Sequence, residues 1–162
     1  MEKKEYLRIC LSAFLIQLLI ALGTALVYLL VQSSSPIAYP LLKIIRFISL
    51  LYLAYILGIA FALLQRRGLG SSFLLLAVAT LADFSGGLLS LFLKNLITEE
   101  PFVWVEILQT FTAALESTLL PLTILFSGSY LLFFSKSRKR PAGLFDFSAP
   151  LPRSLLFTAG LS

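Results

Sequence analysis

The first long apolar run of the chain reads ICLSAFLIQLLIALGTALVYLLV, residues 9–31, and it is broken only by the polar residues Ser12, Gln17 and Thr24. A membrane-spanning helix needs about 20 consecutive, mostly apolar residues. The apolar core of a secretory signal peptide is shorter, at about 7 to 15 residues. We therefore expect residues 9–31 to form a retained transmembrane helix.

Three further apolar runs follow, and each ends at residues that favour a turn or a membrane interface. We expect the four spans at residues 9–31, 41–64, 71–93 and 110–134. The link between the second and third spans is only QRRGLG, residues 65–70, so these two helices should be antiparallel neighbours. The predicted fold class is an all-α integral membrane protein, a bundle of four transmembrane helices with short loops.

The fourth helical stretch, residues 102–134, is too long for one crossing. A helix of this length reaches roughly 50 Å, whereas the hydrocarbon layer is about 30 Å thick. We therefore expect residues 102–109 to lie in the interface or beyond it. Pro121 should kink this helix or free a backbone carbonyl, because proline has no N–H to donate.

The composition agrees with a membrane location and excludes several kinds of site. Of the 162 residues, 59% are hydrophobic and 13% are charged, whereas soluble chains have about 45–50% and about 25%. The sequence contains no histidine and one cysteine, Cys10. Zinc, haem and copper sites built on these residues are therefore excluded, as are an intrachain disulfide and His-activated nucleophiles. We expect no metal and no cofactor.

Basic residues divide unevenly between the two sides of the predicted bundle. The side with both termini receives ten of the 13 lysines and arginines, and the other side receives Lys43, Arg46 and Lys94. Because cytoplasmic loops carry an excess of Lys and Arg, we expect both termini in the cytoplasm and the protein in a bacterial inner (plasma) membrane. This topology accounts for the net charge of +5. The expected partners are the lipid bilayer and other membrane subunits or a second copy, not nucleic acid.

The C-terminal part of the chain differs in composition from the rest. Residues 1–140 should form the transmembrane domain and residues 141–162 a cytoplasmic tail with three prolines. We expect this tail to be irregular. It is either disordered or docked on the membrane surface or on a partner through its apolar pieces, residues 144–145 and 155–157.

Besides Lys43 near the start of the second predicted span, three charged residues lie inside the predicted spans, and an ionised side chain at the helix centre costs about 2.5–3.5 kcal/mol. They are Arg46, Asp83 and Glu116, and Gln109 extends the polar side of the fourth helix. At about 1.5 Å per residue from the cytoplasmic helix ends, Arg46 and Glu116 share a depth and Asp83 lies one to two turns deeper. We expect an intramembrane polar cluster in which Arg46 pairs with Glu116.

The role of these charges has more than one interpretation. In a structural role, Asp83 is protonated or accepts a hydrogen bond from Gln17, Thr80 or a hydroxyl of the fourth helix, because a buried acid without a partner becomes neutral. In a functional role, Asp83 and Glu116 line an outward-facing polar pocket or a proton or cation pathway, and Arg46 and Lys43 attract anionic groups. A third possibility is a docking site for a partner's transmembrane helix.

Small residues recur on two of the predicted helices. The second carries Ala54, Gly58 and Ala62 at four-residue spacing, and the third carries Gly86 and Gly87. Small residues let transmembrane helices approach closely. We expect these five positions to be helix-packing sites, inside the bundle or, as the alternative, at a dimer face.

An enzymatic activity is not predicted. An aspartyl protease needs a close pair of acids, and the segment LADFSGG, residues 81–87, supplies one aspartate. No glycine-rich phosphate loop with a lysine occurs. We therefore expect a non-catalytic accessory or scaffold subunit of a larger membrane assembly. The alternative is a small transporter or channel subunit with an outward-facing polar pocket around Asp83, Glu116 and Arg46.

Overall fold

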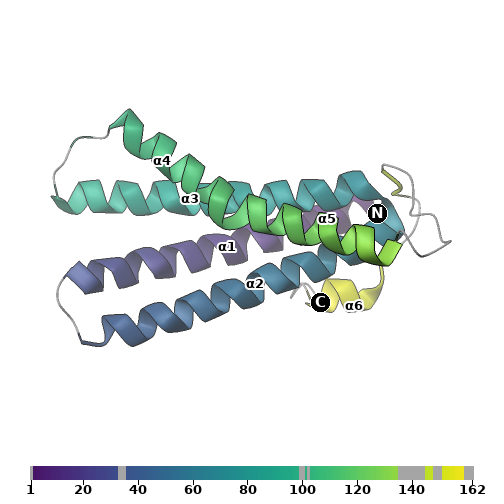
Figure 1. The fold of residues 1–162 in the computed structure, drawn as a ribbon, viewed down its shortest axis with the longest axis horizontal. Helices are drawn as coiled ribbons and strands as arrows, with labels where there is room; N and C mark the ends of the chain where they lie inside the picture. The colour runs from purple at the N-terminus through teal and green to yellow at the C-terminus, as the bar shows by residue number, and fades with distance from the viewer. Residues whose placement is uncertain are drawn as a thin grey trace.

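The computed structural model describes residues 2–32, 36–98, 101, 103–134, 145–147 and 151–158. These residues form an all-helical bundle (Figure 1). Its elements in chain order are α1 (Glu2–Gln32), α2 (Ala38–Arg67), α3 (Leu69–Thr98), α4 (Trp104–Ala114), the π-helical turn η1 (Leu115–Leu119), α5 (Leu120–Phe134) and α6 (Arg153–Thr158).

Four helices are long and apolar enough to cross a membrane, as the sequence predicts. These candidate spans are Lys3–Leu30, Ala38–Arg67, Leu69–Ile97 and Trp104–Leu132. Most of their ends lie beyond the predicted limits. The segment between the first two predicted spans, residues 32–40, is therefore partly helical, because α2 already begins at Ala38.

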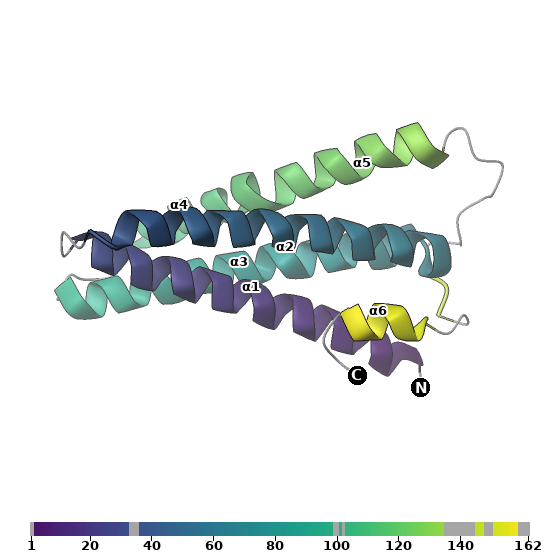
Figure 2. The ribbon, with the colours of Figure 1, turned by 90° about the horizontal axis from the view of Figure 1, so that it is seen from below.

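The link between α2 and α3 is reduced to a single residue, Gly68, whose φ is 88°. Glycine adopts a positive φ without the steric cost that a Cβ brings. Beside this turn the Ser72 hydroxyl donates to the carbonyl of Ala60 at 2.7 Å. The two helices are therefore antiparallel neighbours, as expected (Figure 2).

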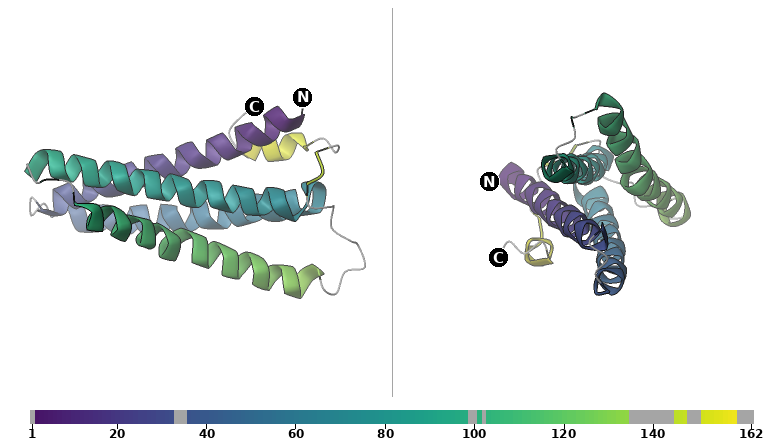
Figure 3. Two further views of the ribbon diagram at one scale, coloured as in Figure 1. Left: turned by 90° about the horizontal axis from the view of Figure 1, so that it is seen from above. Right: turned by 90° about the vertical axis from the view of Figure 1, so that its left-hand side faces the viewer.

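The hydrophobic core contains residues of α1, α2, α3, α5 and α6 and lies toward the end of the bundle that holds the N-terminus. In α5, the Phe126 ring stacks on Phe61 of α2, with the centroids 5.0 Å apart, and meets Phe73 of α3 edge-on at 5.6 Å. Beyond this contact α5 diverges from α2 and α3 toward its C-terminal end (Figures 2 and 3).

Part of the C-terminal stretch packs on the same end of the bundle. The Asp146 N–H donates to the carbonyl of Arg67 at 2.9 Å. The Phe147 ring lies 5.0 Å from the guanidinium carbon of Arg67 and 5.7 Å from the ring of Tyr6. Leu151 is buried in the core, and α6 follows it. The remainder of the predicted tail lies outside the described residues.

Candidate functional site

Asp83 lies partly buried in α3, and its carboxylate accepts three hydrogen bonds from other elements. Gln17 of α1 donates its Nε2 to Oδ1 at 2.8 Å. Ser117 and Thr118 of η1 donate their hydroxyls to Oδ2 at 2.8 Å and 2.6 Å. A bond from Gln17 and bonds from fourth-helix hydroxyls are among the arrangements expected from the sequence. Thr80, the other donor considered, bonds within its own helix. We call the group of four residues that meet here the Asp83 cluster.

The two consecutive donors to one carboxylate oxygen lie in a π-helical turn. In an α-helix, successive side chains point about 100° apart. A π-helix has i→i+5 hydrogen bonds and turns less per residue, and in η1 the Leu120 N–H donates to the carbonyl of Leu115. Pro121 follows directly and has no N–H for the carbonyl of Ser117. The irregularity expected at Pro121 thus takes the form of a π-helical turn on its N-terminal side.

Two glycines close to Asp83 allow α3 to approach its neighbours. A Cβ added at Gly86 would collide with the Cβ of Ala21 in α1. A Cβ added at Gly87 would lie 2.5 Å from the Cγ2 of Thr110 in α4. The absence of side chains at these positions therefore brings α1 and α4 close to α3 beside the Asp83 cluster.

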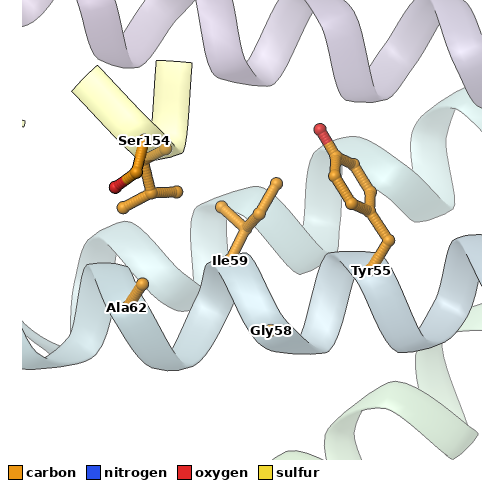
Figure 4. Close-up of a pocket in the computed structure, with 6 residues that line it drawn as sticks. Tyr55, Gly58, Ile59, Ala62 and Ser154 are labelled. Atoms are coloured by element: carbon orange, nitrogen blue, oxygen red, sulfur yellow. The ribbon is translucent and has the colours of Figure 1, made fainter. Parts of the chain in front are cut away.

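The small residues of α2 lie differently from those of α3. Ala54 is exposed, and a Cβ added at Gly58 would meet nothing within 4 Å. Ala62 packs against the core. An apolar groove of about 360 Å³ runs between α2 and α6 (Figure 4), lined by Tyr55, Gly58, Ile59, Ala62, Ser154 and Leu155. Ala54 thus lies on the outside of the bundle, and Gly58 lines the groove without a close contact.

Arg46 and Glu116 are not brought to Asp83 or to each other. Both side chains are exposed, and within the described residues no ion pair joins them. The expected Arg46–Glu116 pair is therefore wrong for this structure. A shared depth sets the level of two residues along the bundle axis but says nothing about which side of each helix they occupy.

The polar side of the fourth stretch faces outward. Its buried positions recur every four residues: Ala114, Thr118, Leu122 and Phe126. Its exposed polar side chains include Gln109, Thr112 and Glu116. We call these three residues the outer polar stripe. Gln109 and Glu116, which we expected in one polar cluster with Asp83, are thus exposed, and of the four buried positions Thr118 alone brings a hydroxyl inside.

A further group of polar residues, at the end of the bundle where α3 ends and α4 begins, was not predicted. The Nζ of Lys94 in α3 lies 3.6 Å from Oε1 of Glu106 in α4, and Nδ2 of Asn95 donates to Oε2 of Glu106 at 3.5 Å. Opposite charges on either side of a short loop were the signal that could have indicated it. Lys94 also borders a cavity of about 360 Å³ between α1, α3 and α4, whose lining does not include Asp83.

Two of these polar groups, the Asp83 cluster and the outer polar stripe, differ in their surroundings. The Asp83 cluster connects α1, α3 and η1; Gln17 and Thr118 are buried, Asp83 is partly buried and Ser117 is exposed. The outer polar stripe lies on the surface of α4 and η1. Comparison with protein-family models, with curated proteins and with solved structures finds no match to this chain.

Proposed function

We propose that this protein is a non-catalytic accessory or scaffold subunit of a larger assembly in a bacterial plasma membrane, with both termini in the cytoplasm. The observation that carries the proposal is the outer polar stripe. It exposes Gln109, Thr112 and Glu116 on a helix that is otherwise apolar enough to cross a bilayer.

Glu116 is the energetically costly member of the stripe. It lies about 9 Å along the helix axis from residue 110, where the predicted span begins, and therefore inside a hydrocarbon layer about 30 Å thick. An ionised side chain facing lipid costs about 2.5–3.5 kcal/mol at the helix centre, and a side chain at the depth of Glu116 carries part of this cost. A neighbouring subunit that presents a basic group or hydrogen-bond donors to Glu116 removes this cost, which is why the stripe supports a protein partner over a purely lipid surrounding.

Hydrogen bonds between the helices inside the bundle support a scaffold role. The Tyr6 hydroxyl of α1 donates to the carbonyl of Ser71 in α3 at 2.6 Å. The Tyr52 hydroxyl of α2 donates to the carbonyl of Ala13 in α1 at 2.8 Å. Together with the Asp83 cluster, these bonds connect neighbouring helices and favour one fixed arrangement.

The alternative, a transporter or channel subunit, requires Asp83, Glu116 and Arg46 to share one pocket. Glu116 and Arg46 are exposed on other faces of the bundle, whereas Asp83 is bonded to interior donors. This separation favours the scaffold proposal.

The proposed orientation depends on the basic residues. The N-terminus, the end of α5 and α6 lie at one end of the bundle (Figures 1 and 3). Ten of the 13 lysines and arginines were assigned to that side, and such a bias is typical of the cytoplasmic face.

The proposal is tested by purifying the tagged full-length protein from its native membrane in mild detergent and measuring the mass and composition of the complex. We expect Glu116→Gln to leave the bundle folded and to weaken retention of the associated subunits about tenfold or more, because a desolvated charge pair loses one partner. Lys43→Gln is the matched control, since it removes an exposed charge from α2, away from the stripe. Equal retention of the same subunits by wild type and Glu116→Gln, or a wild-type protein that carries no other chain, would argue against the proposal.

A further inference from the structure

The negative charge of Asp83 has no basic partner among the residues that the structure describes. Its carboxylate is bonded to an amide and two hydroxyls. Arg46 is exposed on α2, and Lys94 is paired with Glu106. Neutral donors lower the cost of a partly buried carboxylate but do not cancel its charge, and an ion inside a membrane protein without a counter-charge is costly.

The side chains around Asp83 can also act as oxygen ligands. Each hydroxyl is both a donor and an acceptor, so Ser117 and Thr118 can turn a lone pair toward a cation at the carboxylate. Gln17 is 6% exposed and its Oε1 has no hydrogen-bond partner, although its Nε2 is bonded to Asp83. Rotation of the terminal amide exchanges these two atoms and brings the unpartnered oxygen to the carboxylate.

The chemistry of these ligands indicates the class of ion. Carboxylate, amide carbonyl and hydroxyl oxygens suit hard cations. The cluster has one carboxylate, so a monovalent cation leaves it neutral, whereas a divalent cation leaves a net positive charge inside the bundle. No group of three or more His, Cys, Asp or Glu side chains occurs in the described part of the chain, which also disfavours a transition metal.

We propose that Asp83, Gln17, Ser117 and Thr118 form a binding site for a monovalent cation of the Na⁺ class. The four residues come from α1, α3 and η1, so the bound ion holds three elements together and neutralises the only acid of α3. Two of the ligands, Ser117 and Thr118, lie in the π-helical turn and donate to the same carboxylate oxygen. This site goes beyond the proposed scaffold function and does not depend on a partner subunit.

The test is thermal unfolding of the full-length protein in detergent, titrated with NaCl against choline chloride at matched ionic strength. A ligand that binds only the folded state stabilises it in proportion to the logarithm of its concentration. We expect the wild-type Tm to rise by about 5–10 °C at 100 times the Kd for Na⁺. Choline is too large for the site and should produce no rise.

Variants show whether the effect comes from this site. Asp83→Asn should abolish the rise caused by Na⁺, and Thr118→Val and Gln17→Leu should shift the half-saturating Na⁺ concentration about tenfold or more upward or abolish saturation, since each removes one ligand. Glu116→Gln is the matched control and should retain the wild-type response. Thr118→Val and Gln17→Leu keep the proposal testable if Asp83→Asn does not fold, because both variants retain the carboxylate.

Three results would overturn the proposal. One is an equal response to Na⁺ in wild type and in the cluster variants that fold. Another is an equal response to NaCl and choline chloride, which indicates a general salt effect. The third is stabilisation of the wild type by acid pH with no Na⁺ response, which assigns the site to a proton.

Discussion

At the scale of single residues, the missing side chain of Gly86 decides how closely α1 and α3 approach. A Cβ at this position would collide with Ala21, whereas a Cβ at Gly58 would meet nothing within 4 Å. The same substitution should therefore have opposite effects at the two sites, because overpacking costs about 1–3 kcal/mol and alanine is favoured over glycine in a helix by about 1 kcal/mol.

We expect Gly86→Ala to lower the free energy of unfolding by about 1–3 kcal/mol and Gly58→Ala to leave it unchanged or raise it slightly. The measurement is reversible unfolding of both variants in mixed detergent micelles, followed by circular dichroism. If Gly86→Ala is as stable as Gly58→Ala, the contact with Ala21 is not a close one.

The hydrogen bonds of Asp83 mark the limit of what the sequence predicts for single residues. A bond from Gln17 could be anticipated because a buried acid needs donors and Gln17 is a polar interruption of an apolar run. The donors Ser117 and Thr118 could not be named individually, since an α-helical periodicity puts consecutive residues on different faces. The prediction of an Arg46–Glu116 pair was wrong because depth along a helix does not determine the side of the bundle that a residue faces.

At the scale of elements, the four apolar runs identify the four long helices but not their ends. Hydropathy falls where a helix leaves the hydrocarbon layer, whereas the helix itself continues until its backbone hydrogen bonding stops. For this reason α1 already begins at Glu2 and α3 continues to Thr98, beyond the predicted spans. Pro121 indicated an irregularity in the fourth stretch, but proline alone does not distinguish a kink from the π-helical turn that forms before it.

The C-terminal segment leads to a second prediction, which concerns the packing of this segment on the bundle. Leu151 is 6% exposed and lies in the core, whereas Phe145 is 53% exposed. We expect Leu151→Ala to lower the free energy of unfolding by about 2 kcal/mol, at the lower end of the cost of truncating a buried leucine. Phe145→Ala, the control, should lower it by less, because Phe145 is exposed and loses only the stacking of its ring on Phe147 at 6.2 Å.

The check is the same unfolding measurement, with limited proteolysis of the native protein alongside it. Leu151→Ala should also make the C-terminal segment more sensitive to cleavage. Equal stability and equal cleavage of the two variants would contradict the packing of Leu151 against the bundle.

At the scale of the whole molecule, the orientation in the membrane is open to a direct test. Single cysteines are placed at Ser34 and Thr98 on one side and at Ser137 on the other, in a background with Cys10→Ser. If both termini are cytoplasmic, the cysteines at positions 34 and 98 react with an impermeant thiol reagent in intact cells and the cysteine at position 137 reacts only after lysis. The reverse labelling pattern would invert the proposed topology.

The measurement that tests the central claim most directly is ion flux through the purified protein in liposomes, because a scaffold subunit and a conduit differ in this property. Wild type and Asp83→Asn are reconstituted separately, their fold is verified by circular dichroism, and Na⁺ and proton gradients are imposed. The scaffold proposal predicts no flux above that of protein-free liposomes for either protein, even with Na⁺ bound at the Asp83 cluster. Flux of Na⁺ or protons through the wild type that is lost in Asp83→Asn would contradict it.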